Sequence, residues 1–311
     1  MSGTAPPGRV LYVLTGCTAS GKTECALQWA ETRGAEILSC DSLLFYRGMD
    51  IGTAKPSLGE RSRVRHHLID IREASEPMNV AAYSRMAREA AEDIASRGHP
   101  VLVVGGSGFY LKSFFAPVTD SVDVPATVRA CVAEVLKGQG LEGLLRELTR
   151  LNPSGLGPLD TANPRRVAAA LERCLASGRT LAELSRDFAR APRPFEGWEV
   201  RLARLDLPAA DLEARIAARV DAMLGAGLVD EVSRLVAAGL RSNPSAARAI
   251  GYRETIDVLE GRAPAASLAA TIAKDTRALV KKQRTWFRTQ LPPHVAMDAA
   301  QPGLAGRLFL G

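Results

Sequence analysis

The chain has 311 residues, of which 46% are hydrophobic and 24% are charged, and its formal net charge is +6. It is long enough for one large α/β domain and a smaller second domain, and its charge permits an anionic partner. Its five cysteines include no C-x-x-C pair, which excludes a cysteine zinc site or disulfide framework and favours free thiols in a reducing compartment. No run approaches the roughly 18 apolar residues of a membrane span. We therefore expect a cytoplasmic protein without a membrane partner.

The first structured element is expected directly after a leader at 1–9, which is rich in Pro and Gly, lacks the apolar run of a signal peptide and is expected to be flexible. Residues 10–14 are an apolar run typical of a buried strand, 16–23 read GCTASGKT, and a helical pattern follows. This context fits the polyphosphate-binding motif G-x-x-x-x-G-K-[ST], in which backbone N–H groups and a helix N-terminus attract an anion. The candidate binding residues are Gly16, Thr18, Ala19, Ser20, Gly21, Lys22 and Thr23, and the Thr23 hydroxyl is also a candidate ligand for Mg²⁺.

A second strand at 36–40 is expected to deliver Asp41 and Ser42 to the carboxyl edge of a parallel sheet, beside the phosphate loop. The following segment, LLFYRGMDIGTAKPS, lacks periodicity and is predicted to be a long functional loop. A further strand is expected within 64–71. A helix is predicted over 80–97, with Tyr83, Met86, Ala90 and Ile94 on its apolar face.

The clearest later strand, at 100–104, ends in Gly105 and Gly106 with no acidic residue. Ordinary P-loop ATPases place a Mg²⁺-holding acid at the end of such a strand. The sequence therefore has a phosphate cradle without the second half of a nucleotide-hydrolysis site, which argues against a motor or a GTPase.

Between 117 and 197 the strands give way to helices, predicted at 126–136, 141–151, 164–176 and 181–189. A strand at 199–205 returns to the sheet, helices follow at 211–224 and 228–238, and RAIGY at 248–252 leads into another helix. The fold class is therefore α/β, a P-loop-type parallel sheet flanked by helices (10–116 plus 198–311) with an all-helical insertion domain at 117–197.

A long helix is predicted over 267–289. Its basic residues are spaced three or four apart, which places on one stripe Lys274, Arg277, Lys281, Arg284 and Arg288. A stripe without matching acids favours an anionic partner, and a phosphate-backbone contact surface for nucleic acid is the preferred interpretation. With Asp41 beside the loop, these parts suit either a kinase or a transferase with a diphosphate leaving group, and the residues alone do not choose between them.

The blocks GCTASGKT, DSLLFYRGMDIGTAKP, VGGSGFYLK, NPRRVAAALE, RAIGYRE and KKQRTWFR together resemble the tRNA dimethylallyltransferase family over roughly 10–298. The resemblance implies transfer of a dimethylallyl group from dimethylallyl diphosphate to the exocyclic N6 amine of the adenosine 3′-adjacent to the anticodon, with Mg²⁺. It implies that the tRNA anticodon stem-loop is the partner. No C-terminal Cys/His finger follows, which suggests the bacterial type, and we expect a monomer.

The resemblance also assigns roles. Asp41 is expected to be the general base, Ser107 to bond the substrate, and Arg219 to reach the diphosphate together with the phosphate loop. The implied tRNA contacts are Asp41, Ser42, Leu43, Leu44, Arg129, Arg165, Arg166, Arg248, Gly251, Tyr252, Arg253, Lys281, Lys282, Gln283, Arg284, Trp286 and Arg288.

Four positions depart from the family's pattern: Cys17 replaces proline, Ser107 replaces threonine, Lys282 replaces arginine, and Ala169 stands where an arginine is common. An adenylate isopentenyltransferase and a P-loop small-molecule kinase remain the alternatives, as does a non-catalytic RNA-binding protein.

Overall fold

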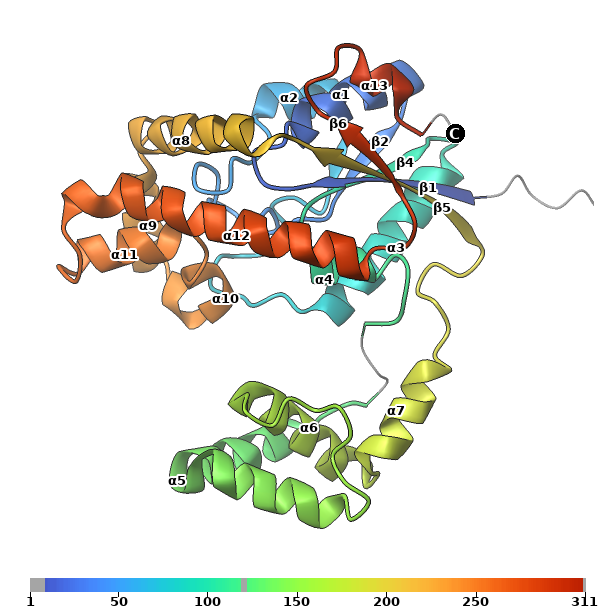
Figure 1. Ribbon diagram of the computed structural model, residues 1–311, viewed down its shortest axis with the longest axis vertical. Coiled ribbons are helices and arrows are strands. Elements are labelled where there is room, and N and C mark those ends of the chain that lie inside the picture. The colour runs from blue at the N-terminus through green and yellow to red at the C-terminus, as the bar shows by residue number, and fades with distance from the viewer. Residues whose placement is uncertain (1–8, 119–121, 310–311) are drawn as a thin grey trace, which may run out of the picture. The chain divides into compact units, whose positions relative to one another are not determined.

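The computed structural model describes residues 9–118 and 122–309 (Figure 1). The chain forms two compact units, one up to Ala116 together with the chain from Arg193 onward, the other Pro117–Pro192. The predicted insertion starts where the second unit starts, but its end at 197 is wrong. Phe195 stacks on Phe114 with ring centroids 4.9 Å apart and so belongs to the larger unit. Of the expected leader, only Arg9 lies within the described residues, and it begins the first strand instead.

Within the described residues the larger unit has a six-stranded parallel sheet of order β3-β2-β4-β1-β5-β6. The strands are β1 Arg9–Gly16, β2 Glu36–Ser39, β3 His66–His67, β4 Val101–Val104, β5 Trp198–Asp206 and β6 Val295–Asp298. Side chains alternate between the faces, so Leu11 and Val13 enter one core while Leu14 enters the other. Parallel strands align their carboxyl ends, and that edge collects the polar loops.

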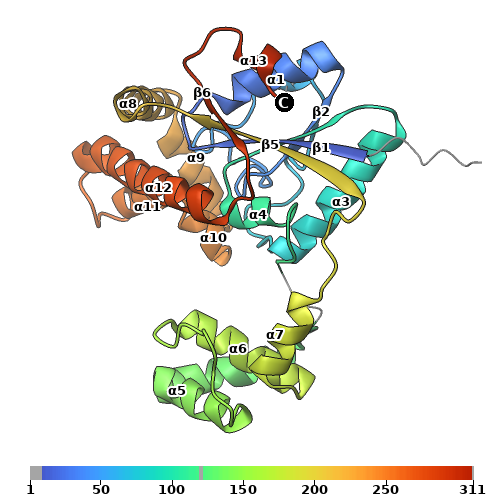
Figure 2. The same ribbon diagram turned by 45° about the vertical axis from the view of Figure 1, so that its right-hand side comes forward.

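Helices cover both faces of the sheet (Figures 1 and 2). They are α1 Lys22–Arg33, α2 Leu58–Arg63, α3 Val80–Ser96, α4 Gly108–Lys112, α8 Ala209–Gly225, α9 Leu228–Ala237, α10 Pro244–Ala247, α11 Tyr252–Leu259, α12 Leu268–Gln290 and α13 Leu304–Arg307. Short 3₁₀ turns occupy Leu240–Ser242 and Ala265–Ser267. The α1 and α13 helices pack on one face, and α3, α4, α8, α9, α11 and α12 contribute to the core on the other. Among the described residues no helix has the length and apolar character to cross a membrane.

Three local predictions need refinement. The apolar face of α3 includes the buried Ala87 and Ala91 in addition to the predicted Tyr83 and Ile94, and the predicted Met86 and Ala90 are half-buried and pack against the same core. The strand expected within 64–71 shrinks to two residues, because Leu68 and Asp70 have positive φ and turn the chain away. The final strand β6 was not predicted, since it is short and largely exposed on the sheet edge.

The second unit is helical, as the sequence predicts, with α5 Ala126–Leu151, α6 Pro164–Ser177 and α7 Leu181–Ala189. Gly140 interrupts α5 with φ 63° and ψ −159°, at the break expected between two predicted helices. Val132, Leu148 and Leu171 belong to its own apolar core. Thr180 and Glu183 form a reciprocal cap at the start of α7.

A buried carboxylate lies at the amino end of the sheet. Glu36 begins β2, its side chain is 8% exposed, and it forms a two-pronged ion pair with Arg97. His67 Nε2 lies 2.6 Å from the same carboxylate. The hydrogen bond from Arg97, and after it that from His67, lower the pKa of Glu36 to about 2 against the upward effect of burial.

Replacing Glu36 with Gln is expected to lower the free energy of unfolding by about 3 kcal/mol, because Arg97 loses its buried partner. Urea denaturation at pH 7 measures this loss. The pKa of the carboxyl is depressed, so its stabilisation is complete above the unfolded value near 4.5 and is lost as pH falls toward 2. The wild type and the variant should therefore converge over that range. Glu92→Gln, which removes an exposed partner of Arg88, is the control, and an equal loss there would contradict the prediction.

Candidate active site

The phosphate loop joins β1 to α1 at the carboxyl edge of the sheet. Gly16 has no room for a side chain, since a Cβ there would lie 2.6 Å from the Leu205 carbonyl oxygen. Ala19 and Gly21 have φ of 65° and 88°, which curls the loop around the helix N-terminus. The Ser20 hydroxyl is buried and has no hydrogen-bond partner among the described residues. This loop is shaped for a ligand that accepts hydrogen bonds.

Lys22 turns its ammonium group back onto the loop. Its Nζ donates to the carbonyl oxygens of Gly16 and Cys17 at 2.8 and 2.7 Å. Burial lowers the pKa of Lys22 to about 8, and the charge of Asp41 opposes that shift. The loop thus holds a poorly solvated cation, which an incoming anion would stabilise.

Asp41 follows β2, as predicted. Its Oδ1 accepts the Leu43 backbone N–H at 3.0 Å, so the carboxylate caps a turn. Among the described residues, the other carboxylate oxygen accepts no hydrogen bond. Ser107, after β4, accepts the Ser42 N–H at 3.0 Å and donates to the Ser42 hydroxyl at 3.2 Å. The ends of β2 and β4 are therefore tied together beside Asp41.

The strand ends leave no space at Gly105. A Cβ there would lie 1.9 Å from the carbonyl oxygen of Cys40, and the Thr15 hydroxyl donates to the Gly105 carbonyl at 2.8 Å. Gly108 is constrained as well, since a Cβ there would lie 2.5 Å from the Trp286 ring. The backbone after β4 thus packs directly against β2 and α12.

Arg219 reaches the site from α8. Its Nη2 donates to the Thr53 carbonyl at 3.1 Å, and burial lowers its pKa while the charge of Asp41 opposes the shift. Arg215, one turn earlier, borders the same phosphate-loop cavity. Sequence reasoning missed Arg215, although the spacing of four residues in RIAAR puts both arginines on one helix face.

Two cavities meet at these residues. One of about 410 Å³ is lined by the phosphate loop, Pro56 and Arg215. The other, of about 610 Å³, is lined by Ser42, Ser107, Arg248, Lys282 and Trp286, among others. The residues that line both are Thr18, Asp41, Thr53 and Arg219. A carboxylate and a guanidinium therefore stand where a phosphate-bearing ligand in one cavity would face a second molecule in the other.

The basic helix α12 divides its predicted contacts between two sides. Lys282, Gln283 and Trp286 line the 610 Å³ cavity. The other side borders a separate cavity of about 590 Å³, whose cationic lining includes Arg277, Lys281, Arg284 and Arg288. The sequence predicted a stripe of cations without partners, but two of them have partners in the protein. Arg277 lies 3.5 Å from Glu213, and Arg284 donates to the Leu207 carbonyl at 2.5 Å.

Gln283 has a structural use that the sequence did not reveal. Its Oε1 accepts the Thr18 N–H at 3.0 Å, and its Nε2 donates to the Gly106 carbonyl at 2.9 Å. One side chain of α12 thereby fastens the phosphate loop to the end of β4. In this conformation both polar atoms of the amide are hydrogen-bonded within the protein. Contacts with RNA would therefore come from neighbouring side chains of α12 and not from this amide.

The predicted contacts around 248–253 also separate. Arg248 is exposed and lines the larger cavity, in agreement with its expected position. The structure places Tyr252 away from the surface, since the residue is 0% exposed, and Gly251 is buried as well. Arg253 forms ion pairs with Glu254 and Asp275. Arg129, Arg165 and Arg166 lie exposed on the second unit.

Comparisons with known proteins identify the family of this chain. A sequence model of the family described as IPP transferase matches residues 44–290. The chain is 67% identical over 299 residues to the tRNA dimethylallyltransferase of Opitutus terrae, covering 96% of both chains, and 39% identical over 307 residues to that of Deinococcus radiodurans, covering 97% and 96%.

Solved structures extend the likeness. The tRNA isopentenylpyrophosphate transferase of Bacillus halodurans has a TM-score of 0.68 at 30% identity, with 94% of this chain and 90% of that chain covered. A eukaryotic dimethylallyltransferase acting on tRNA shares the fold, with a TM-score of 0.81 at 23% identity over 94% of this chain and 74% of that one. This chain belongs to the IPP transferase family.

Proposed function

We propose that this protein transfers a dimethylallyl group from dimethylallyl diphosphate to the exocyclic N6 amine of the adenosine 3′-adjacent to the anticodon of tRNA, acting as a monomer in the cytoplasm. The observation that carries the proposal is the meeting of two cavities at Asp41 and Arg219, one lined by the phosphate loop. The names of the curated relatives support dimethylallyl transfer to tRNA.

The smaller cavity would hold the diphosphate. Bond cleavage between the allyl carbon and the diphosphate oxygen leaves negative charge on the departing diphosphate. Loop N–H groups, Lys22 and Arg219 stand ready for that charge before the reaction begins. Such preorganised stabilisation is usually the largest single contribution to catalysis.

The larger cavity would receive the adenine. A base must leave the stack of the anticodon loop to reach a buried site, and an aromatic wall such as Trp286 suits an unstacked base. As the new carbon–nitrogen bond forms, Asp41 accepts the proton that the amine loses. Ser107, already bonded to Ser42, can turn its hydroxyl toward the amine or ring nitrogen.

Mg²⁺ fits the donor set of the loop. The Thr23 hydroxyl borders the diphosphate cavity, and among the described residues no cluster of three His, Cys, Asp or Glu side chains offers an all-protein metal site. Mg²⁺ commonly takes few protein oxygens together with substrate phosphates and water. When bound, the ion would neutralise diphosphate charge, with Thr23 as its protein ligand.

One assay separates this proposal from its rivals. The protein is incubated with Mg²⁺, labelled dimethylallyl diphosphate and either unmodified tRNA or AMP, and separately with γ-labelled ATP. Label in the tRNA alone supports the proposal. Label only in AMP would assign an adenylate isopentenyltransferase, and phosphoryl transfer from ATP would assign a kinase. Binding of tRNA with no transfer would leave a binding protein.

Lys281→Ala is expected to weaken tRNA binding and to reduce the slope of log affinity against log salt concentration by about one unit, because one phosphate contact is lost. Filter binding measures the slope at salt concentrations from about 50 to about 300 mM, a range over which salt screens contacts between exposed charges. Arg33→Ala, at the exposed end of α1, is the matched control. An unchanged slope for Lys281→Ala would remove this side of α12 from the interface.

A further inference from the structure

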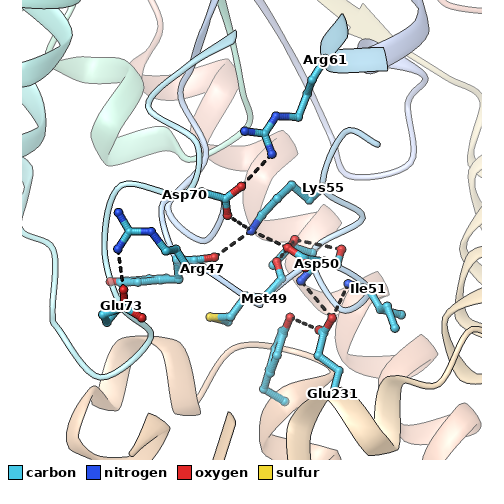
Figure 3. A network of polar contacts seen from close by, with 12 residues as sticks. Arg47, Met49, Asp50, Ile51, Lys55, Arg61, Asp70, Glu73 and Glu231 are labelled. Carbon is cyan, nitrogen blue, oxygen red and sulfur yellow. Dashed lines mark hydrogen bonds and ion pairs between the residues drawn. The ribbon is translucent and has the colours of Figure 1, made fainter. Parts of the chain in front are cut away.

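The long loop after Asp41 is held from two sides by charged side chains, as Figure 3 shows. On the first side, Lys55 has a side chain only 3% exposed. Its Nζ lies 2.7 Å from Asp50 and 2.5 Å from Asp70, and it also donates to the Tyr46 carbonyl at 2.8 Å. Arg61 pairs with the second oxygen of Asp70 at 2.7 Å. These ion pairs stabilise the loop, but the charged residues that form them do not line either of the two cavities.

On the second side, a single carboxylate accepts hydrogen bonds from three consecutive backbone N–H groups of the loop. Glu231 of α9 is 2% exposed, and it accepts the backbone N–H groups of Asp50, Ile51 and Gly52 at 3.0, 2.7 and 3.1 Å (Figure 3). The Tyr252 hydroxyl donates to it at 2.7 Å. Four donors compensate a buried anion, which would otherwise be costly to keep ionised.

Tyr252 completes this support. Its ring lies against Gly52, where a Cβ would come within 2.6 Å of the ring carbons. Burial, and then the charge of Glu231, raise the pKa of Tyr252 well above its ordinary value, so the hydroxyl stays protonated and remains a donor. The chain at Gly52 is thereby fixed by hydrogen bonds on one side and by an aromatic surface on the other.

Thr53, the residue after Gly52, links the contacts of Glu231 and Tyr252 to Arg219. The Thr53 carbonyl accepts Nη2 of Arg219, and Thr53 lines both cavities. We propose that Glu231 and Tyr252 are positioning residues that hold Thr53 where its carbonyl aims Arg219 at the diphosphate. This inference rests on the proposed function. It assigns to a buried carboxylate on α9 a part in binding the allylic diphosphate, although it touches no substrate.

Glu231→Gln tests the proposal in the full chain with tRNA as acceptor. The amide accepts fewer backbone N–H groups and presents an N–H of its own to them. We expect a KM for dimethylallyl diphosphate about 10-fold higher, and an equal rise in the inhibition constant of inorganic pyrophosphate, from the loss of charged hydrogen bonds. The KM for tRNA should stay within about twofold, since the change acts on the diphosphate side. Tyr252→Phe keeps the ring against Gly52 and should give a smaller rise of about threefold.

Two comparisons make the test specific. Glu36→Gln removes a similarly buried carboxylate at the other end of the sheet, and it should destabilise the protein without changing either constant. In a protein that already carries Arg219→Ala, Glu231→Gln should cause almost no further rise in either diphosphate constant, because Glu231 acts through Arg219. Unchanged diphosphate constants in both Glu231→Gln and Tyr252→Phe, or a full additional effect without Arg219, would overturn the inference. A wild-type protein that transfers no dimethylallyl group would instead overturn the proposed function, and direct pyrophosphate binding to the variants would still test the positioning.

Discussion

Asp41→Ala is expected to lower turnover at least ~10²-fold while tRNA binding is retained, because the adenine amine loses its general base. Single-turnover transfer from labelled dimethylallyl diphosphate, with tRNA in excess over its binding constant, isolates the chemical step. Filter binding at the same salt concentration measures the affinity for tRNA.

Asp41 also orders a turn through its bond to the Leu43 N–H, and a structural effect must be separated from a chemical one. Asp41→Asn provides the separation, since its amide oxygen can still accept that N–H but the side chain cannot take a proton at neutral pH. We expect Asn and Ala to be about equally inactive. A nearly active Asn variant, or loss of tRNA binding with unchanged turnover, would assign Asp41 a purely structural role.

Lys22→Met should lower kcat/KM for dimethylallyl diphosphate by about 10²- to 10³-fold, the range found when one preorganised group that stabilises developing charge is removed. Lys22 lines the cavity that would hold the diphosphate, and among the described residues its ammonium group hydrogen-bonds only to the loop itself. Initial rates at low dimethylallyl diphosphate and saturating tRNA measure the change. A loss below about threefold would mean that the loop amides and Arg219 hold the diphosphate without it.

The same lysine predicts a pH dependence. Its pKa in the free protein is lowered to about 8, so the binding-competent cation is lost as pH rises through that value. The kcat/KM, which reports the free enzyme, should therefore fall above about pH 8 in the wild type. Lys22→Arg keeps its charge, and its residual activity should lack this fall. An identical fall in both proteins would assign the titration to another group.

Much of the molecule could be predicted from short-range patterns. The phosphate loop, the position of Asp41 after β2 and the helices of the second unit follow from glycine spacing, apolar periodicity and caps, all of which act within a few residues. The break in α5 was likewise visible at Gly140.

Other features depend on contacts between distant segments and were out of reach. Tyr252 looks like a surface aromatic beside two arginines, yet Glu231 and Gly52 bury it, and no local pattern records that pairing. Gln283 sits in a basic block typical of RNA contacts, but its bonds go to Thr18 and Gly106, more than 170 residues away in sequence. Strand β6 is too short and too exposed to have a clear periodicity.

The crowding at Gly105 sets a limit on what this architecture can become. An aspartate at the end of β4 would recreate the metal-holding acid of a nucleotide hydrolase, yet even its first side-chain carbon would overlap the Cys40 backbone. At Gly106 that carbon would come within 3.0 Å of Gln283 and 3.1 Å of the Gly16 carbonyl. No single substitution can install the acid at Gly105 without parting two central strands. Steric exclusion between β2 and β4 thus keeps the position after β4 without a side chain, and a carboxylate there would require the two strands to move apart.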